Sequence, residues 1–584
     1  MTKHMKTKFI FILIALVALN IQSCDKFLEE KLISDVSASS YYSTAAGLED
    51  AVDATYNYLK YVYSNERAYT LTVFGTDTYT NGADGNFKGF NYYDNTLSSD
   101  QAILREMWER CYQGVNQANA VLGRAAAVTD MADATKTIRL AEVRFLRALY
   151  YFTLVRQWGD VPLPLTETIG VVTEAPKSTQ AEVYEKALVP DLEFAIANLP
   201  NTQSDYGRAT KAAAEHLLGL VLLTRGYTSY AKSDDFDRSI TYFSNVIANY
   251  GFTLNTDMAK LWDQDNQRSK EIIFAVQNST NVLLNSGGDG VLPGEGNRGH
   301  LYFLMEYDVQ PGMIRDIANG RPFKRFRPSN YLLDLWAADR DKDNRYDLTY
   351  KHAWISNNTN MPKWSAAEVA AGAKNKDGSA AVAGVNKYAV GDTAIFIPGP
   401  GNDAKWTATK KLQTRYRVYT RNEYSERIFA HIGKFIDPRR SAIQWTEGSR
   451  DWFIMRLGDT YLLRAEAYFK KSNLASAAAD INVVRTRAAK PGQIGAMQIT
   501  PAQVTLNYIL DERARELDAE QCRWYDLVRT GTLVDRVKLY NPLAVAFIQP
   551  FHVRRPYPLT QIDRTLPVGS FTQNCGYPGG PPCN

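Results

Sequence analysis

The sequence has few histidines and cysteines and little excess charge, and each shortage excludes a class of function. Its 584 residues include six His and five Cys, and neither type recurs at the spacing of zinc ligands. The formal net charge is only +4, so no basic face for nucleic acid is indicated. A zinc enzyme and a nucleic-acid-binding protein are therefore not expected.

Long apolar runs are also missing, with one exception at the N-terminus. Three lysines precede the apolar residues 9–19, which are too few to span a bilayer but fit a secretory signal. Ser23 and Cys24 follow, and a small residue before a Cys at this place resembles the lipobox of lipoproteins. We therefore expect residues 1–23 to be a signal peptide and Cys24 to be lipidated. The alternative is an ordinary signal peptide with an incidental Cys.

Local signatures of catalysis and of metal binding are weak. Residues 294–299 match G-x-G-x-x-G, but no apolar strand leads into them. Residues 339–343 open like a calcium loop, yet Tyr350 stands where a bidentate Glu is needed. Glu512 and Glu516 share a helix face like a glycosidase pair, but flanking arginines favour an ion-paired structural helix. No cofactor, no metal and no enzyme activity are predicted.

Residues 452–529 carry the clearest periodic pattern. Apolar residues at steps of three and four predict an amphipathic helix with this stripe: Ile454, Leu457, Tyr461, Ala465 and Tyr468. A second helix, with Ala477, Ile481 and Val484 on one face, is expected to pack antiparallel to the first. Thr500, Pro501 and Gln503 form a capping-box pattern, which predicts that a third helix starts there.

The same hairpin pattern occurs elsewhere in the chain. Leu457-Gly458 with Tyr461, followed by Ala477, matches the tetratricopeptide spacing of a glycine on the first helix and a small residue on the second. Leu218-Gly219, followed by Ser239, repeats it. Weaker copies involve residues 142–200 and a helix from residue 506. The sequence therefore predicts a mainly α fold built from helical hairpins.

Between the hairpins lie segments of different character. Residues 66–100 are rich in Thr, Gly, Asn and aromatics and read as loops. Residues 251–450 include a short strand at 271–276, a helix at 328–338 and a long surface excursion at 357–403. Such insertions on a rigid scaffold often carry binding residues.

Several strings in the C-terminal half resemble the SusD/RagB family, in this order: RLGDTYLLRAEAY, DINVVRTRA, ILDERARELDAEQCRWYDLVRTG, RRPYPLTQID and QNCGY. The sequence departs from the family pattern at Cys522, where a small residue is usual, and at Cys575, where Pro is usual. The resemblance implies a tetratricopeptide-like helical scaffold with long loop insertions and few short strands. It also implies one SusD-like domain over residues 24–584, with an N-terminal part at 24–300 and a C-terminal part at 301–584.

The resemblance further implies a function. Members of this family are lipid-anchored on the extracellular face of a Gram-negative outer membrane. Each caps a SusC-like TonB-dependent transporter and captures glycan or, in one branch, peptide. We therefore expect a glycan-binding lipoprotein with a transporter partner. A peptide-binding relative and a glycoside hydrolase without a local signature are the alternatives.

The expected ligand site lies on the loops at residues 69–93 and 281–354. Their setting gives aromatic residues no amphipathic period that would bury them, so some rings should face solvent and stack on sugars. The expected stacking residues are Tyr79, Tyr92, Tyr302 and Trp354, and the expected hydrogen-bonding residues are Asp77, Asn81 and Asn297. The alternative is that these rings hold the loops on the scaffold.

The remaining cysteines are assigned from their surroundings. Cys575 and Cys583 flank a Gly/Pro-rich stretch that closes easily into a ring, so we predict a disulfide between them. Cys111 and Cys522 lie in helical strings and are expected to be small buried apolar groups.

Overall fold

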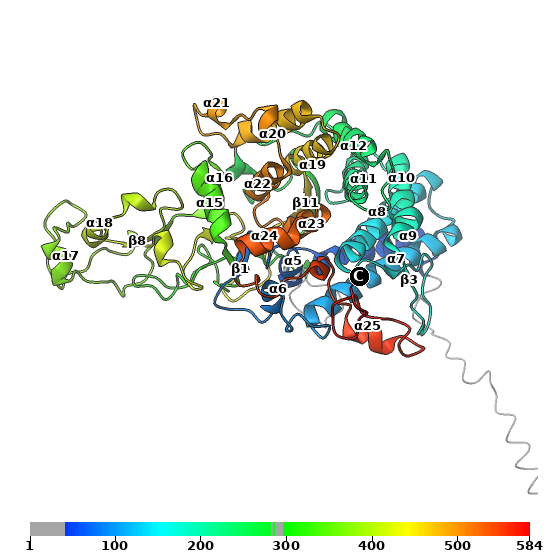
Figure 1. Ribbon diagram of the computed structural model, residues 1–584, viewed down its shortest axis with the longest axis horizontal. Helices are drawn as coiled ribbons and strands as arrows, with labels where there is room; N and C mark the ends of the chain where they lie inside the picture. The colour runs from blue at the N-terminus through cyan, green and yellow to red at the C-terminus, as the bar shows by residue number, and fades with distance from the viewer. Residues whose placement is uncertain (1–40, 282–283, 286–295, 584) are drawn as a thin grey trace, which may run out of the picture.

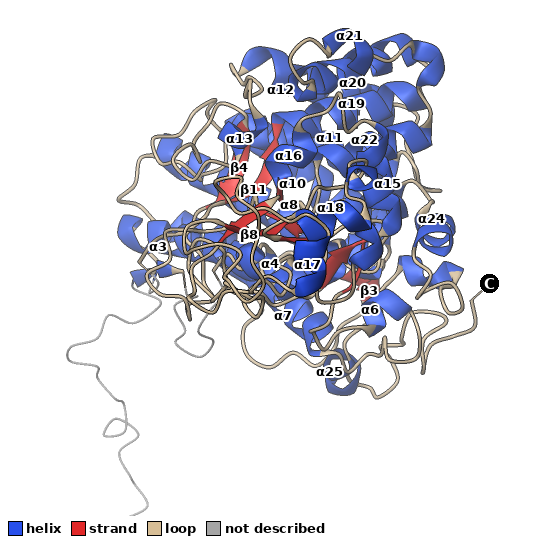
Figure 2. Cartoon of the chain, turned by 90° about the vertical axis from the view of Figure 1, so that its left-hand side faces the viewer, coloured by secondary structure: helices blue, strands red, loops and turns tan. Residues whose placement is uncertain are grey.

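A computed structural model describes residues 41–281, 284–285 and 296–583. The signal segment, Cys24 and much of the loop at 281–299 lie outside the described residues. Within the described part the fold is mainly helical, with long loops and short strands (Figure 2).

Helical hairpins form the scaffold, as the sequence predicts. They are α7 (Ala102–Arg124) with α8 (Asp133–Trp158), α11 (Lys211–Arg225) with α12 (Asp235–Asn249), and α19 (Leu457–Lys470) with α20 (Leu474–Ala488). The weaker copies also pack as helices: α10 (Val189–Asn198) lies on α8, and α22 (Leu506–Glu516) lies on α19. Figure 1 shows α8, α10, α11, α12, α19 and α20 following one another along the upper right of the molecule.

Small residues allow the helices of one hairpin to approach closely. A Cβ added to Gly219 would lie 2.7 Å from the Phe243 ring. On the facing helix, Ser239 donates a 2.8 Å hydrogen bond to the carbonyl of Gly219. The glycine and the small residue of the tetratricopeptide pattern therefore meet at the contact between the two helices, which explains their spacing.

Two helix starts lie later than expected. Ile454 belongs to strand β11 (Trp452–Arg456), which pairs antiparallel with β4 (Ile272–Val276), so the helix begins at Leu457. The helical period at residues 452–456 is misleading because pairing with a distant strand decides the structure there. On α19, Leu457 and Ala465 of the expected stripe are buried, whereas Tyr461 and Tyr468 are only half-buried. Leu462 and Leu463 are buried as well.

The capping box at Thr500 is present but caps a 3-10 turn, Pro501–Gln503. The helix α22 starts after it, with Thr505 as its N-cap. The Thr505 hydroxyl accepts a 3.1 Å hydrogen bond from the backbone N–H of Tyr508. The capping-box pattern at Thr500 therefore predicts a cap correctly, but the element that it caps is the 3-10 turn and not α22.

The strand and the helix expected in the insertion are found near their predicted bounds. At the N-terminal end of the described residues lie α3 (Ala45–Asn57) and α4 (Leu59–Val62). The strand expected at 271–276 is β4, and the helix expected at 328–338 is α15 (Asn330–Ala338). Further helices are α5 (Glu66–Thr72), α23 (Arg523–Arg529) and α24 (Leu533–Tyr540).

Short antiparallel strand pairs connect loop segments that are separated in the sequence. Strand β1 (Tyr79–Asn81) pairs antiparallel with β5 (Phe326–Pro328). The other pairs are β2 (Val161–Pro162) with β3 (Lys177–Ser178), and β6 (Tyr350–Lys351) with β10 (His431–Ile432). The β1–β5 pair joins the loop region after α5 to the insertion between the hairpins, whereas β6–β10 lies within the insertion and β2–β3 lies after α8.

The expected surface excursion and the residues after it, as far as α18, form an arm at the left of the molecule in Figure 1. The arm contains α17 (Ala366–Ala370) and α18 (Ala408–Gln413). A three-stranded sheet crosses its base, with order β7 (Ala353–Ile355), β8 (Thr393–Phe396) and β9 (Arg417–Val418). The arm has its own small apolar cluster around Trp364.

A buried charge network joins the insertion to the C-terminal helices. The fully buried guanidinium of Arg345 contacts Asp343 at 2.7 Å, Glu512 at 2.8 Å and Glu516 at 3.0 Å. Arg485 and Arg515 also bind Glu512, while Arg456 and Arg487 bind Glu516. The expectation that the two glutamates are ion-paired is therefore confirmed. Of the two flanking arginines, however, Arg513 binds Asp459 and Asp526 instead.

The network holds its glutamates ionised. Burial alone would raise the pKa of Glu516, but the neighbouring arginines lower it to about 2. The pKa of Glu512 is also below its usual range, against the effect of burial, because of Arg345, Arg515 and Arg485. A depressed carboxyl pKa adds stability at pH values above the unfolded-state pKa. That stability is lost as the pH falls through the folded-state value.

Replacing Arg345 by methionine should destabilise the protein strongly. The variant leaves carboxylates buried without their cation, so the free energy of unfolding at pH 7 should fall by about 3–5 kcal/mol. Urea unfolding followed by circular dichroism measures this change. The deficit should shrink toward pH 4, because protonation then relieves the uncompensated carboxylates.

Lys186→Ala is the matched control for Arg345→Met. Lys186 pairs with Glu182 at 2.7 Å, but the two side chains are 57% and 41% exposed. Its removal should change the unfolding free energy by less than about 1 kcal/mol. Equal losses of unfolding free energy in the two variants would show that burial does not increase the contribution of these ion pairs to stability.

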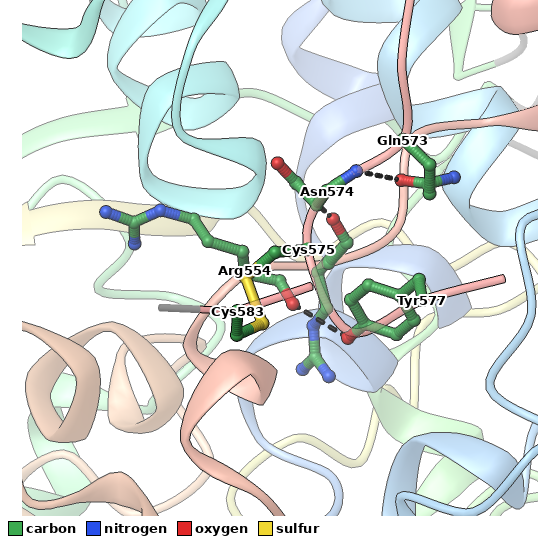
Figure 3. Close-up of a disulfide and its surroundings, with 7 residues drawn as sticks. Arg554, Gln573, Asn574, Cys575, Tyr577 and Cys583 are labelled. Atoms are coloured by element: carbon green, nitrogen blue, oxygen red, sulfur yellow. Dashed lines mark hydrogen bonds between the residues drawn. A yellow bond between two sulfur atoms is a disulfide. The ribbon is translucent and has the colours of Figure 1, made fainter. Parts of the chain in front are cut away.

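The C-terminal disulfide that the sequence predicts is present (Figure 3). Cys575 and Cys583 are joined, with Cα atoms 5.0 Å apart. Within the loop that the disulfide closes, the Tyr577 hydroxyl donates a 2.7 Å hydrogen bond to the carbonyl of Arg554. This bond holds the loop against the rest of the protein. Cys111 is buried as expected, whereas Cys522 is only half-buried.

Thiol titration of the mature protein, unfolded without reductant, should count two free thiols, those of Cys111 and Cys522. The same titration after reduction should count four. Four thiols before reduction would contradict the disulfide.

Candidate functional site

The aromatic residues expected to stack on sugars are mostly interior. The exposed fraction is 0% for Tyr79, 1% for Tyr302 and 0% for Trp354. Tyr79 donates a 2.7 Å hydrogen bond to Asp518, and Tyr302 packs on Tyr69 with ring centres 5.6 Å apart. The expectation that these three rings face solvent is wrong, because strand pairing and ring packing fold the loops back onto the scaffold. Only Tyr92 keeps a partly exposed ring.

The expected polar partners are also buried and engaged. Asp77 binds Arg523 at 2.6 Å and Arg536 at 2.7 Å. Burial alone would raise the pKa of Asp77, but the two guanidinium groups hold it below its usual range. Its carboxylate is therefore a structural anchor for α23 and α24.

Asn81 and Asn297 support loops. The Asn81 amide donates a 2.7 Å hydrogen bond to the Tyr92 hydroxyl. The side-chain oxygen of Asn297 accepts a 2.9 Å hydrogen bond from the backbone N–H of Gly299. The structure thus brings Asn81 and Tyr92 together, while Trp354 lies in a separate core beside His431. The seven residues do not line one site.

Accessible tryptophans indicate where an aromatic surface does exist. All ten tryptophans lie in the described residues, and eight of them are buried. Trp445 is 40% exposed and Trp406 is half-buried. Only these two can offer an indole face to a ligand.

Trp406 lies at the edge of an open hollow of about 870 Å³ on the arm, which we call the Trp406 hollow. Polar residues line most of the rest of its surface: Asn330, Asp403, Lys411, Thr420, Arg421, Asn422 and Glu423. An indole beside amides, carboxylates and cations is the combination that binds a sugar ring, because the apolar ring face stacks while hydroxyls find partners.

Local structure fixes the Trp406 ring. It follows the 3-10 turn Asp403–Lys405 and precedes Thr407, the N-cap of α18. Phe396 on β8 supports it with ring centres 5.5 Å apart, and the Lys410 amine lies 4.6 Å from the ring centre. The ring is therefore held in place before a ligand arrives.

The polar wall of the Trp406 hollow is also held in place. The Asp403 carboxylate accepts a 2.9 Å hydrogen bond from the backbone N–H of Arg421. Glu423 binds Lys411 and accepts a 2.8 Å hydrogen bond from Thr420. Burial opposes ionisation of Glu423, but these partners lower its pKa. The side chains of Asn330 and Asn422 are exposed and reach solvent.

Sequence reasoning missed this hollow. The insertion at residues 251–450 is expected to carry binding residues and includes Trp406, but the expected site lies on the loops at 69–93 and 281–354. No local signal singles out Trp406, because Trp364 also lies in a polar string and is buried.

Trp445 forms a second accessible aromatic surface. Arg321 connects it to Phe323: its guanidinium donates a 3.1 Å hydrogen bond to the Gln444 carbonyl and lies 5.2 Å from the Phe323 ring centre. Phe323 is half-buried and falls within the loop range expected to bind ligand. Trp445 does not line the Trp406 hollow, so the two indoles belong to separate surfaces.

The carboxylates that resembled a glycosidase pair have no access to substrate. Glu512 and Glu516 are fully buried and bound to arginines. The Asp339 to Asp343 string likewise binds arginines, Asp343 at Arg345 and Asp339 at Arg485. The described residues contain no group of three or more His, Cys, Asp or Glu arranged to hold a metal. None of the helices described crosses a membrane by length and hydropathy.

Comparison with known proteins agrees with this fold. The SusD-like protein P25 of Formosa agariphila is 23% identical over 95% of this chain and 97% of its own length. The starch-binding protein SusD of Bacteroides thetaiotaomicron is 24% identical over 79% of this chain and 76% of its own length. A solved laminarin-binding SusD-like protein superposes with a TM-score of 0.64 at 23% identity, over 91% of this chain and 100% of that one.

Two family profiles match the chain. The profile described as starch-binding associating with outer membrane matches residues 26–223. The profile of the SusD family matches residues 270–577, which is more than half of the chain. The protein therefore belongs to the SusD family.

Proposed function

We propose that the protein captures glycan at the cell surface and delivers it to a SusC-like TonB-dependent transporter, which it covers as a lid. The Trp406 hollow carries this proposal, since it combines an accessible indole with a polar wall and room for several sugar units. The relatives named for starch and laminarin binding support glycan as the ligand class.

The proposed role is binding without turnover. The one carboxylate pair that matched a hydrolase pattern is buried in the Arg345 network. In the Trp406 hollow, Asp403 and Glu423 already bind backbone and side-chain donors. Stacking and hydrogen bonds to hydroxyls then give an affinity on the order of millimolar to micromolar, which suits capture and release.

Replacing Trp406 by alanine should weaken oligosaccharide binding about tenfold or more. The loss follows from removing the ring face, worth about 1–2 kcal/mol with its supporting contacts. Calorimetry with maltohexaose and laminarihexaose, on the mature protein in a detergent without a sugar headgroup, measures it. Circular dichroism should be unchanged, because the ring is at the surface of the arm.

Two further variants sharpen the test. Trp406→Phe keeps a ring and should retain most of the affinity. Trp445→Ala is the matched control, because it removes the other accessible indole. If Trp445→Ala abolished binding while Trp406→Ala did not, the site would lie at the Trp445 surface instead.

The proposal includes a lipid anchor at Cys24, placed on the extracellular face of the outer membrane. The apolar residues 9–19 and the Ser23-Cys24 pair support it. Two or three acyl chains would hold the protein stably, whereas a single chain gives only marginal binding. The anchor would keep the protein beside its transporter.

Purification of the native protein from outer membranes in mild detergent should recover a large β-barrel protein with it. Cys24→Ala should release the protein from the membrane fraction. Recovery of the wild type only as a free monomer would contradict the lid role, and membrane retention of Cys24→Ala would contradict the anchor.

A further inference from the structure

Positive charge is concentrated on the arm around Trp406. Residues 403–423 contain six Lys or Arg and two Asp or Glu, which gives this segment a formal charge of +4. The whole chain also carries +4, so positive and negative residues balance over the rest of it. Every residue that lines the Trp406 hollow belongs to this segment except Asn330. The cation excess of the protein therefore surrounds its candidate ligand site.

The carboxylates near the hollow are already shared among cations. Glu423 binds both Lys411 and Arg417, the latter at 2.9 Å. Arg421 pairs with Asp334 on α15, which lies outside the segment. These ion pairs neutralise part of the positive charge, but the acidic residues are too few to neutralise all of it.

Two lysines on either side of Trp406 have no acidic partner. Lys405 and Lys410 are both exposed. The Lys405 amine donates a 2.8 Å hydrogen bond to the neutral side chain of Asn402, and the Lys410 amine lies 4.6 Å from the centre of the Trp406 ring. Within the part of the chain that the structure describes, neither amine forms an ion pair with a carboxylate.

The position of these amines matters for a ligand on the indole. A sugar ring that stacks on Trp406 brings its substituents close to the Lys410 amine, because that amine already lies over the ring. An ammonium group offers three hydrogen-bond donors and a full charge. Hydrogen bonds between two charged groups are about twice as strong as those between neutral groups. A carboxylate or a sulfate on the sugar uses this charge, whereas a hydroxyl does not.

The field around the hollow acts in the same direction. A surface with an excess of one sign attracts ions of the opposite sign and raises their local concentration. Since the unpaired amines are exposed, an incoming anion does not have to displace a carboxylate from them. The surroundings of Trp406 are thus suited to a sugar that carries negative charge.

We propose that the Trp406 hollow selects an anionic saccharide, whose carboxylate or sulfate groups bind Lys405 and Lys410 while its ring stacks on Trp406. This substrate class rests on the proposed function and narrows it. Neutral oligosaccharides have only the ring and the polar wall to bind, so their affinity is lower.

The experiment compares charged and neutral hexamers by calorimetry, on the mature protein in an uncharged detergent without a sugar headgroup. Sulfated laminarihexaose is compared with laminarihexaose, which has the same backbone, and hexagalacturonic acid with maltohexaose. At about 50 mM sodium chloride, at least one acidic hexamer should bind at least tenfold more tightly than its neutral counterpart. At about 500 mM most of this preference should disappear, because salt screens exposed charges. The acid that is preferred identifies the group, sulfate or carboxylate.

Paired substitutions test the two lysines. Lys405→Gln with Lys410→Gln should weaken binding of the preferred acid at least tenfold, whereas Lys405→Arg with Lys410→Arg should retain the preference. Lys260→Gln with Lys270→Gln is the matched control, because it removes the same charge from two exposed positions outside the arm. The control should keep the preference, and circular dichroism should be unchanged in all three variants.

Each outcome has a distinct meaning. Equal affinity for acidic and neutral hexamers, or a preference that survives Lys405→Gln with Lys410→Gln, overturns the anionic ligand and leaves glycan capture standing. The same holds if Trp406→Ala leaves acidic binding unchanged. Equally tight binding of a hexaglutamate peptide overturns the assignment to a saccharide. Absence of binding of all four hexamers to the wild type overturns the proposed function as well.

Discussion

The architecture depends on the ion pairs that Arg345 makes inside the protein. One fully buried guanidinium joins Asp343 in the long insertion to Glu512 and Glu516 on α22. Arginine suits this place because its planar group offers several donors in a fixed geometry and stays charged when buried. The network fixes how the insertion sits on the helical hairpins, since moving either part would leave charges buried without partners.

The protein has two parts, a packed interior that contains the Arg345 ion pairs and an accessible arm. Loops after α5 are held down by β1–β5 pairing and by the ion pairs of Asp77 with Arg523 and Arg536. The arm beyond β7 has a small apolar cluster around Trp364, and an open hollow lies beside Trp406. A rigid body with a polar, partly exposed arm is suited to presenting a binding surface without enclosing a reaction.

The candidate site was predictable only in outline. Sequence composition indicated that the insertions would carry binding residues and that a glutamate pair on α22 would be structural. It also placed Tyr79, Tyr302 and Trp354 at the surface, and they are interior. A ring in a Gly/Asn-rich string has no periodic sign of burial, yet its exposure depends on which distant segment covers it. Trp406 and Trp445 carry no stronger local signal than the buried tryptophans.

The sequence by itself determined the helical hairpins, the small residues at their contacts, the C-terminal disulfide and the family, because periodicity, spacing and motif order are properties of the chain. Only the tertiary structure decided where helix gives way to strand at Ile454, which of the arginines bind Glu516, and which aromatic rings reach solvent. The physical reason is that these features depend on partners in other elements, such as β4 for β11 and Arg345, which is 171 residues away, for Glu516. No local pattern records such a partner.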